Sequence, residues 1–96
     1  MLEKEIEQYF CMAVKTRLSG WPLKFTSPGQ NGMPDRIVLL PGGKIYFVEL
    51  KAPGKKVRKL QEHAHQKLHA LGFPVQLIDT REAADDFVRE VQAGGI

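Results

Sequence analysis

Two carboxylates and a lysine stand at the ends of two neighbouring apolar runs in this sequence. Asp35 opens the run 35–40, and Glu49 and Lys51 close the run 45–51. Both runs are rich in Ile, Val and aromatic residues, which predicts strands, and the Pro-Gly-Gly sequence between them predicts a tight turn. The predicted hairpin therefore brings two acids and a lysine to the same end.

The length of the turn decides whether the two acids face each other. If Leu40 pairs with Lys44 across a three-residue loop, Asp35 lies opposite Glu49 with side chains roughly 5 Å apart. A two-residue loop would place the acids on opposite faces of the hairpin. We favour the first register because a divalent cation, held by carboxylate oxygens at about 2.0–2.1 Å as Mg²⁺ is, fits between facing acids. The alternative is two solvent-exposed acids paired with nearby lysine or arginine.

Length and composition fit one domain covering residues 1–96. The chain has 96 residues, of which 43% are hydrophobic and 26% charged, and these values are ordinary for a globular protein. No apolar stretch approaches the roughly 20 residues that span a bilayer, and the N-terminal sequence lacks the apolar segment of a signal peptide. We expect a cytoplasmic location. Cys11 is the single cysteine, which excludes an intrachain disulfide and a cysteine-based zinc cluster and predicts a small buried side chain.

Positive charge is concentrated just after the hairpin. The net charge is only +3 with a pI of about 9.2, but residues 51–67 hold one acid, Glu62, and six basic residues: Lys51, Lys55, Lys56, Arg58, Lys59 and Lys67. Such a patch could bind phosphates by counterion release. A solvated helix start is the other interpretation of a short charge run. The position directly after the two acids favours polyanion binding.

The rest of the chain predicts three helices and two further strands around the hairpin. An amphipathic helix is predicted over residues 2–19, with Glu7 at the edge of its buried face and Glu3 nearer its end. A strand over 21–26 follows, and the loop 27–33 leads directly to Asp35. That loop could line a binding site or serve as a plain connector.

After the hairpin, a second helix is predicted over 57–71, followed by a strand over 73–78 and a third helix that starts at Asp79 or Thr80. The expected core face of the second helix is Val57, Leu60, Ala64, Leu68 and Leu71, with Gln61 beside it and able to lean toward the sheet. A helix between the last two strands implies a crossover, so that pair can be parallel while the hairpin is antiparallel. The predicted fold is an α/β (α+β) domain with a mixed four-stranded sheet flanked by helices.

Two further groups of residues could be read as binding sites but have commoner explanations. His63 and His65 are about 200° apart on the predicted helix and cannot share one ion. His65 and His69 could chelate a metal adventitiously, although surface histidines are the ordinary case. Trp21 and Tyr46 could stack on bases, and packing in the core or an interface is the more common role.

Three segments together resemble a known family. Residues 32–36 (Gly-Met-Pro-Asp-Arg), 47–55 (Phe-Val-Glu-Leu-Lys-Ala-Pro-Gly-Lys) and 57–61 (Val-Arg-Lys-Leu-Gln) are similar to a stand-alone VRR-NUC domain of the PD-(D/E)XK nuclease superfamily. The resemblance implies a restriction endonuclease-like αβββαβ(α) core. The Val-Arg-Arg that names the family appears here with Lys59 in third place, which keeps the charge but loses a guanidinium fork.

The resemblance also implies roles for individual residues. Asp35 and Glu49 would bind Mg²⁺ or Mn²⁺, with the Leu50 backbone carbonyl as a further ligand. Lys51 would orient or activate the attacking water and offset charge on the phosphorane. Such a metal lowers the pKa of its bound water and stabilises the leaving oxyanion, and oxygen ligands favour Mg²⁺ or Mn²⁺ over zinc.

Other family positions fall outside the hairpin. Glu7 matches a first-helix glutamate that related nucleases bring to the metal, and Glu3 is the alternative because its spacing is similar. Gln61 matches a glutamine of the second helix near the site, and Ser27 in the loop is a candidate for substrate contact. The candidate DNA-binding residues are, with Ser27, the basic side chains Lys55, Lys56, Arg58 and Lys59.

The implied function is a metal-dependent endonuclease of bacterial or phage origin that cuts DNA, with preference for branched structures. Two cuts on opposing strands need two sites related by symmetry, which favours a homodimer similar to a Holliday junction resolvase. No small-molecule cofactor is expected. The alternative is a non-catalytic nucleic-acid-binding module on the same scaffold, and an RNA nuclease or another phosphate-ester hydrolase is a third possibility.

Overall fold

Three helices and four strands follow one another in the order that the sequence predicts. The computed structural model describes residues 1–96. Its elements are α1 (Glu3–Leu18), β1 (Trp21–Lys24), β2 (Arg36–Leu40), β3 (Lys44–Leu50), α2 (Lys59–Ala70), β4 (Val75–Ile78) and α3 (Arg81–Gln92). The predicted αβββαβα order is confirmed. None of the helices is long and apolar enough to cross a membrane.

The four strands form one mixed sheet in the order β1-β2-β3-β4. β1 and β2 are antiparallel, as are β2 and β3, whereas β4 runs parallel to β3 after the crossover through α2. Leu40 pairs with Lys44, so the register predicted for a three-residue loop is confirmed. Gly42 and Gly43 have φ angles of +87° and +77° in this turn, a conformation that glycine adopts without steric cost.

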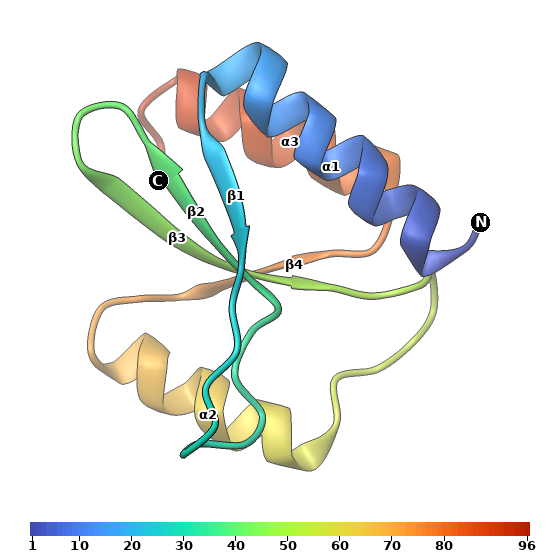
Figure 1. The fold of residues 1–96 in the computed structure, drawn as a ribbon, viewed down its shortest axis with the longest axis vertical. Helices are drawn as coiled ribbons and strands as arrows, with labels where there is room; N and C mark the ends of the chain where they lie inside the picture. The colour runs from blue at the N-terminus through green and yellow to red at the C-terminus, as the bar shows by residue number, and fades with distance from the viewer.

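The core lies between the sheet and two helices that cover one of its faces. Figure 1 shows α1 and α3 side by side over the sheet, with α2 apart from them at the far end. Phe10 of α1 and Phe87 of α3 pack with ring centroids 5.5 Å apart. The largest fully buried aliphatic side chains are Ile6, Val14, Val38, Val48, Leu50 and Val88. Burial of these apolar side chains is the main stabilising contribution in a domain of this size.

Tyr46 packs in this core, against Phe87 at 5.4 Å between ring centroids, and its hydroxyl donates a hydrogen bond to the Ile96 carbonyl. Trp21 is 61% exposed, so it does not pack in the core. Cys11 is half-buried against the core rather than buried. Partial burial raises the pKa of its thiol.

The inward face of α2 differs from the predicted one. Leu60 and Leu71 were expected in the core, but they are 54% and 73% exposed. The stripe that faces the sheet is instead Gln61, Ala64, His65 and Leu68. These positions follow the spacing of one helix face, and they are partly polar because α2 covers the end of the sheet where Glu49 lies. His65 lies in this stripe and is half-buried, unlike an ordinary surface histidine.

Element ends differ from the predicted ones by a few residues. β4 starts at Val75 rather than at residue 73, because Pro74 has no N–H to donate to a strand ladder. α2 starts at Lys59 rather than at residue 57, because Arg58 is the extended residue that precedes the helix. β1 ends at Lys24, yet the N–H of Phe25 still donates to the Asp35 carbonyl. The chain thus stays paired up to the loop 27–33.

The loop 27–33 packs against the start of α2 through Gly32. Its φ angle is +80°, and a Cβ atom built there would overlap the Leu60 carbonyl oxygen.

We expect Gly32→Ala to lower the free energy of unfolding by about 1–3 kcal/mol, because the new side chain is strained both by the positive φ angle and by contact with the Leu60 carbonyl. Urea denaturation measures this loss. Gly29→Ala is the matched control, because nothing lies within 4 Å of its Cβ position, and equal stabilities of the two variants would contradict this close approach.

Candidate active site

Asp35 and Glu49 come together at the end of the hairpin that lies opposite its turn. Arg36 pairs with Val48 in the ladder, and one further step places Asp35 opposite Glu49. The Asp35 Oδ2 atom accepts a hydrogen bond of 3.0 Å from the Leu50 N–H. The Asp35 carboxylate therefore lies against the backbone that follows Glu49.

Glu49 is a buried carboxylate with incomplete hydrogen bonding. It is 1% exposed, and its Oε2 atom accepts from Gln61 Nε2 at 2.8 Å and pairs with Lys51 Nζ at 3.3 Å. Its Oε1 atom is buried without a partner. Burial, and then the nearby charge of Asp35, raise the pKa of Glu49 against the opposing effects of Lys51 and Gln61. A buried oxygen without a donor is costly, so one more positive partner at Oε1 would stabilise this carboxylate.

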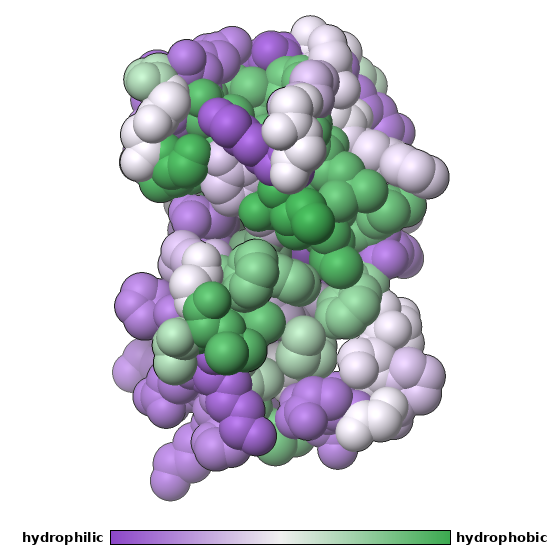
Figure 2. Space-filling view, turned by 90° about the vertical axis from the view of Figure 1, so that its left-hand side faces the viewer, coloured by the Kyte–Doolittle hydropathy of each residue, from purple (hydrophilic) through white to green (hydrophobic).

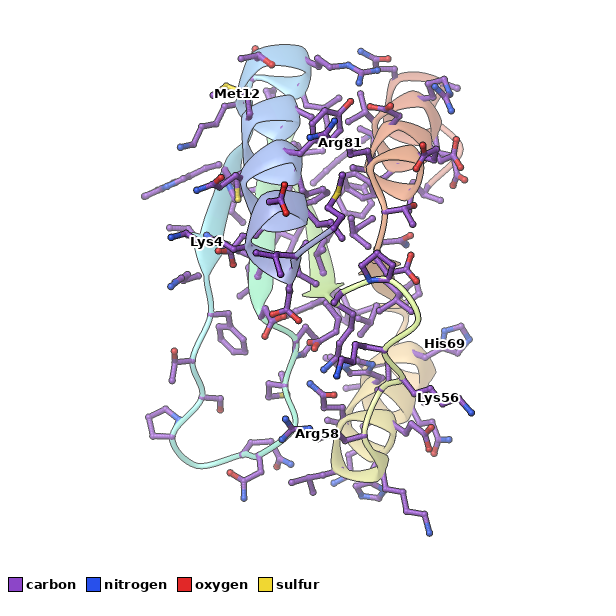
Figure 3. The ribbon with its side chains drawn as sticks, turned by 90° about the vertical axis from the view of Figure 1, so that its right-hand side faces the viewer. Lys4, Met12, Lys56, Arg58, His69 and Arg81 are labelled. Carbon is purple, nitrogen blue, oxygen red and sulfur yellow. The ribbon has the colours of Figure 1, made fainter.

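Lys51 connects Glu49 to a pocket lined with positive charge. The Lys51 side chain is only 12% exposed. It lines a cavity of about 520 Å³ with Glu3, Ala52, Lys55, Lys56 and Arg58. Figure 3 shows Lys56 and Arg58 projecting from the stretch of chain that leads into α2. We call this cavity the cationic pocket.

The structure places three of the four basic candidates in the cationic pocket. Lys59, the first residue of α2, is exposed and lies outside its lining. Ser27 is half-buried in the loop, where its carbonyl accepts a hydrogen bond from the Gln30 N–H. Ser27 lines none of the cavities at this end of the sheet. Direct contact of Ser27 with substrate therefore stays a prediction.

Glu7 lies beside Asp35 but is engaged by a different partner. Both carboxylates line a cavity of about 220 Å³ together with Glu3, Lys24, Phe25 and Thr26; we call it the acid pocket. The Glu7 Oε2 atom pairs with Arg36 Nη2 at 3.1 Å. No three Asp, Glu, His or Cys side chains converge closely enough to hold a metal ion directly. The structure thus brings Asp35 and Glu49 together and leaves the first-helix acid at the wall of the acid pocket.

Gln61 links the start of α2 to Glu49. Its Oε1 atom accepts a hydrogen bond of 3.1 Å from the Arg58 N–H, while its Nε2 atom donates to Glu49. One side chain thus satisfies a free donor at the helix start and orients the buried carboxylate. The expectation that Gln61 leans toward the sheet is confirmed.

His65 belongs to this region, a position that the sequence did not predict for it. It lies one turn after Gln61 on the same face of α2, and its Nε2 atom is buried without a partner. Burial lowers the pKa of the His65 imidazole, Asp35 raises it and Lys51 lowers it. The spacing of four residues from Gln61 was the signal that could have identified it.

The sequence and the fold of this chain both match known proteins. The family model of the VRR-NUC domain matches residues 2–82. The chain belongs to the VRR-NUC domain family. A solved structure described as a VRR_NUC domain superposes on this VRR-NUC domain with a TM-score of 0.83 at 27% sequence identity, covering 91% of this chain and 94% of the other.

A curated relative is similar in sequence over most of its length. The protein named "Putative nuclease p44" of Acyrthosiphon pisum secondary endosymbiont phage 1 is 45% identical to this VRR-NUC domain over 80 residues, which is 83% of this chain and 85% of that protein. The resemblance inferred from the sequence motifs is confirmed, and the matches together support a nuclease.

Proposed function

We propose that this VRR-NUC domain is a Mg²⁺- or Mn²⁺-dependent endonuclease that hydrolyses DNA phosphodiester bonds. The observation that carries the proposal is the buried Glu49 carboxylate, whose Oε1 atom lacks a partner next to Asp35 and Lys51. Asp35, Glu49 and the Leu50 carbonyl would hold the cation, and all of these ligands are oxygen atoms, as Mg²⁺ and Mn²⁺ prefer. A cation bound there would supply Lewis-acid stabilisation of charge on the phosphate.

The side chains of this domain have separate tasks in the proposed reaction. Gln61 orients Glu49 through its 2.8 Å hydrogen bond. Lys51 lies between Glu49 and the cationic pocket, where it can orient the attacking water and offset the negative charge that develops on the phosphate. Lys55, Lys56 and Arg58 bind the neighbouring backbone phosphates.

What supports a homodimer is the sheet face opposite α1 and α3, here called the open face, of which α2 covers the end at Glu49. Leu23, Ile37, Phe47 and Val75 pair across all four strands on this face, and Ile45, Phe73 and Leu77 beside them are 48%, 46% and 43% exposed. Figure 2 views the molecule from the side of the hairpin turn and shows hydrophobic surface across much of it.

The open face also suits a second copy better than it suits DNA. An exposed apolar area of several side chains marks a protein interface, whereas a phosphate backbone needs positive charge. Glu49 lies on this same face two residues beyond Phe47. A dimer formed through the open face therefore holds two candidate active sites. Two sites related by symmetry can cut both strands of a branched DNA, and we propose four-way junctions as the substrate.

The proposed interface predicts the effect of one substitution. We expect Ile45→Asp to convert a dimer into a monomer at micromolar concentration, because a charge in the apolar interface is desolvated without a partner. Sedimentation velocity measures the mass of the particle. Leu2→Asp is the control, because Leu2 is 70% exposed before α1 and away from the open face. A wild-type protein that sediments as a monomer would contradict the proposed dimer.

One gel tests the proposed function. Linear duplex, flap and four-way junction DNA, and a matched RNA duplex, are each incubated with Mg²⁺, Mn²⁺ or EDTA. We expect symmetric nicks at the junction with either metal and no products in EDTA. Strong binding without any products would instead show a non-catalytic nucleic-acid-binding module.

Since the proposed substrate is intracellular DNA, we place the protein in the cytoplasm of a bacterium or of a phage-infected cell.

A further inference from the structure

Arg36 joins three elements of the fold immediately behind the acid pocket. It directly follows Asp35, and because side chains alternate along a strand it points to the opposite face. Its Nη2 atom pairs with Glu7 Oε2 of α1 at 3.1 Å, and its Nη1 atom donates a 2.8 Å hydrogen bond to the Pro22 carbonyl of β1. The side chain is only 12% exposed. One guanidinium thus connects β2 to both α1 and β1.

Glu7 uses only one of its carboxylate oxygens for this contact. The Oε2 atom pairs with Arg36, and no hydrogen bond or ion pair involves Oε1. The side chain is 34% exposed and lines the acid pocket with Asp35. The other charged side chains that line this pocket are Glu3 and Lys24. The ion pair with Arg36 therefore leaves the second oxygen of Glu7 without a protein partner, on a side chain that lines the acid pocket with Asp35.

The buried Arg36 side chain is a poor choice for stability alone. The Arg36 Nε atom is buried without a partner, and a buried donor without an acceptor costs free energy. An apolar side chain of similar volume would fill the same space without that cost. The feature that an apolar side chain could not reproduce is the fixed position of Glu7.

We propose that Arg36 is a positioning residue, which holds Glu7 at the wall of the acid pocket so that Glu7 supports a divalent cation bound by Asp35 and Glu49. The proposal rests on the proposed function. Because the three acids do not converge as direct ligands, Glu7 acts on water that the cation retains, as Mg²⁺ commonly keeps several of its waters. The planar fork is needed because Nη1 and Nη2 reach two different partners from separate nitrogen atoms, whereas lysine has a single nitrogen that cannot occupy both positions.

Binding of Mn²⁺ to the metal-free protein, followed by electron paramagnetic resonance, tests this role without any cleavage. Partners that orient metal-binding carboxylates typically contribute about 10–100-fold to metal affinity. We expect Arg36→Lys to weaken Mn²⁺ binding about tenfold or more although it keeps the positive charge. Glu7→Gln should weaken binding to a similar degree. The double variant should be no weaker than the worse single variant, because both changes remove one arrangement.

Arg17→Lys is the matched control. Arg17 also ties α1 to another element, since its Nη1 atom pairs with Asp85 of α3 at 2.9 Å, but it lies outside the acid pocket. Arg17→Lys should bind Mn²⁺ as the wild type does. Thermal melting of each variant checks that it is folded. If Arg36→Lys does not fold, Glu7→Gln at its half-exposed position carries the test, and unchanged Mn²⁺ affinity in that variant overturns the proposal.

The proposal and the proposed function fail in different ways. If Asp35→Asn binds Mn²⁺ as tightly as the wild type, the metal site itself is wrong. If Asp35→Asn loses Mn²⁺ while Arg36→Lys keeps wild-type affinity, the metal site stands and the role of Arg36 is wrong. Losses in the Arg36→Lys and Glu7→Gln variants that add fully in the double variant would also overturn the proposal, because the two residues would then act independently.

Discussion

Asp35→Asn is expected to lower the rate of junction cleavage in Mg²⁺ by about 10²–10³-fold, the loss expected when charge stabilisation at a reacting phosphate is removed. The asparagine oxygen can still accept the hydrogen bond from the Leu50 N–H, so the local structure is kept while the negative charge is lost. A neutral amide binds a divalent cation far more weakly than a carboxylate does. Single-turnover cleavage of a labelled four-way junction measures the rate.

The control for this prediction is a carboxylate of similar type elsewhere on the surface. Asp86 of α3 has a side chain that is 61% exposed and pairs only with Arg89 of the same helix. Asp86→Asn should cleave at the wild-type rate. Cleavage by Asp35→Asn at the wild-type rate would remove Asp35 from the reaction.

We expect Glu49→Gln to increase the free energy of unfolding of the metal-free protein at neutral pH, although it removes a proposed metal ligand and should abolish cleavage. Burial and Asp35 raise the pKa of Glu49 in spite of the attraction of Lys51. The folded state therefore favours the neutral form of this side chain, which glutamine imitates. Urea denaturation in EDTA at several pH values measures the difference between the two proteins.

The pH dependence of that difference follows from the direction of the shift. The folded protein holds the Glu49 proton to a higher pH than the unfolded chain does, so the wild type loses stability as pH rises above the ordinary glutamate value of 4.5 and through the raised pKa. The advantage of Glu49→Gln should grow as pH rises through the raised pKa and should disappear below about pH 4.5. An advantage that does not change with pH would contradict the linkage.

Cation binding should reverse this order of stabilities. A ligand that binds only the folded state at about 100 times its Kd adds about 2.7 kcal/mol. We expect Mn²⁺ to stabilise the wild type by such an amount and to leave Glu49→Gln unchanged. Equal stabilisation of both proteins would show that Mn²⁺ binds elsewhere.

The hairpin and its register could be predicted because both depend on neighbouring residues. Alternation along the two strands and the Pro-Gly-Gly turn allow few pairings. The pairing of Leu40 with Lys44 was chosen among them because it places Asp35 opposite Glu49, and the structure has this pairing. The inward face of α2 was mispredicted for a physical reason. An apolar stripe predicts a helix face only where the helix covers apolar surface, and this helix covers the buried Glu49 through Gln61.

The partnership of Glu7 with Arg36 could not be predicted from spacing. The two residues are far apart in the chain and meet only because α1 packs across the start of β2. The sequence shows Arg36 as one charged residue of a strand, and its two contacts depend on where α1 and β1 lie. The proposed role of Arg36 therefore depends on the tertiary structure and could not be inferred from the local sequence pattern.

Pro22 protects the β1 edge of the sheet against pairing with strands of other molecules. β1 is an edge strand, and edge strands are templates for aggregation because their outward N–H and C=O groups are free. The N–H of Phe25 points toward β2, and directions alternate along a strand, so the backbone groups of Pro22 point outward. Proline has no N–H to offer there, and its carbonyl is taken by Arg36. A strand of another molecule thus finds neither donor nor acceptor at this position, which disfavours amyloid-like stacking through β1.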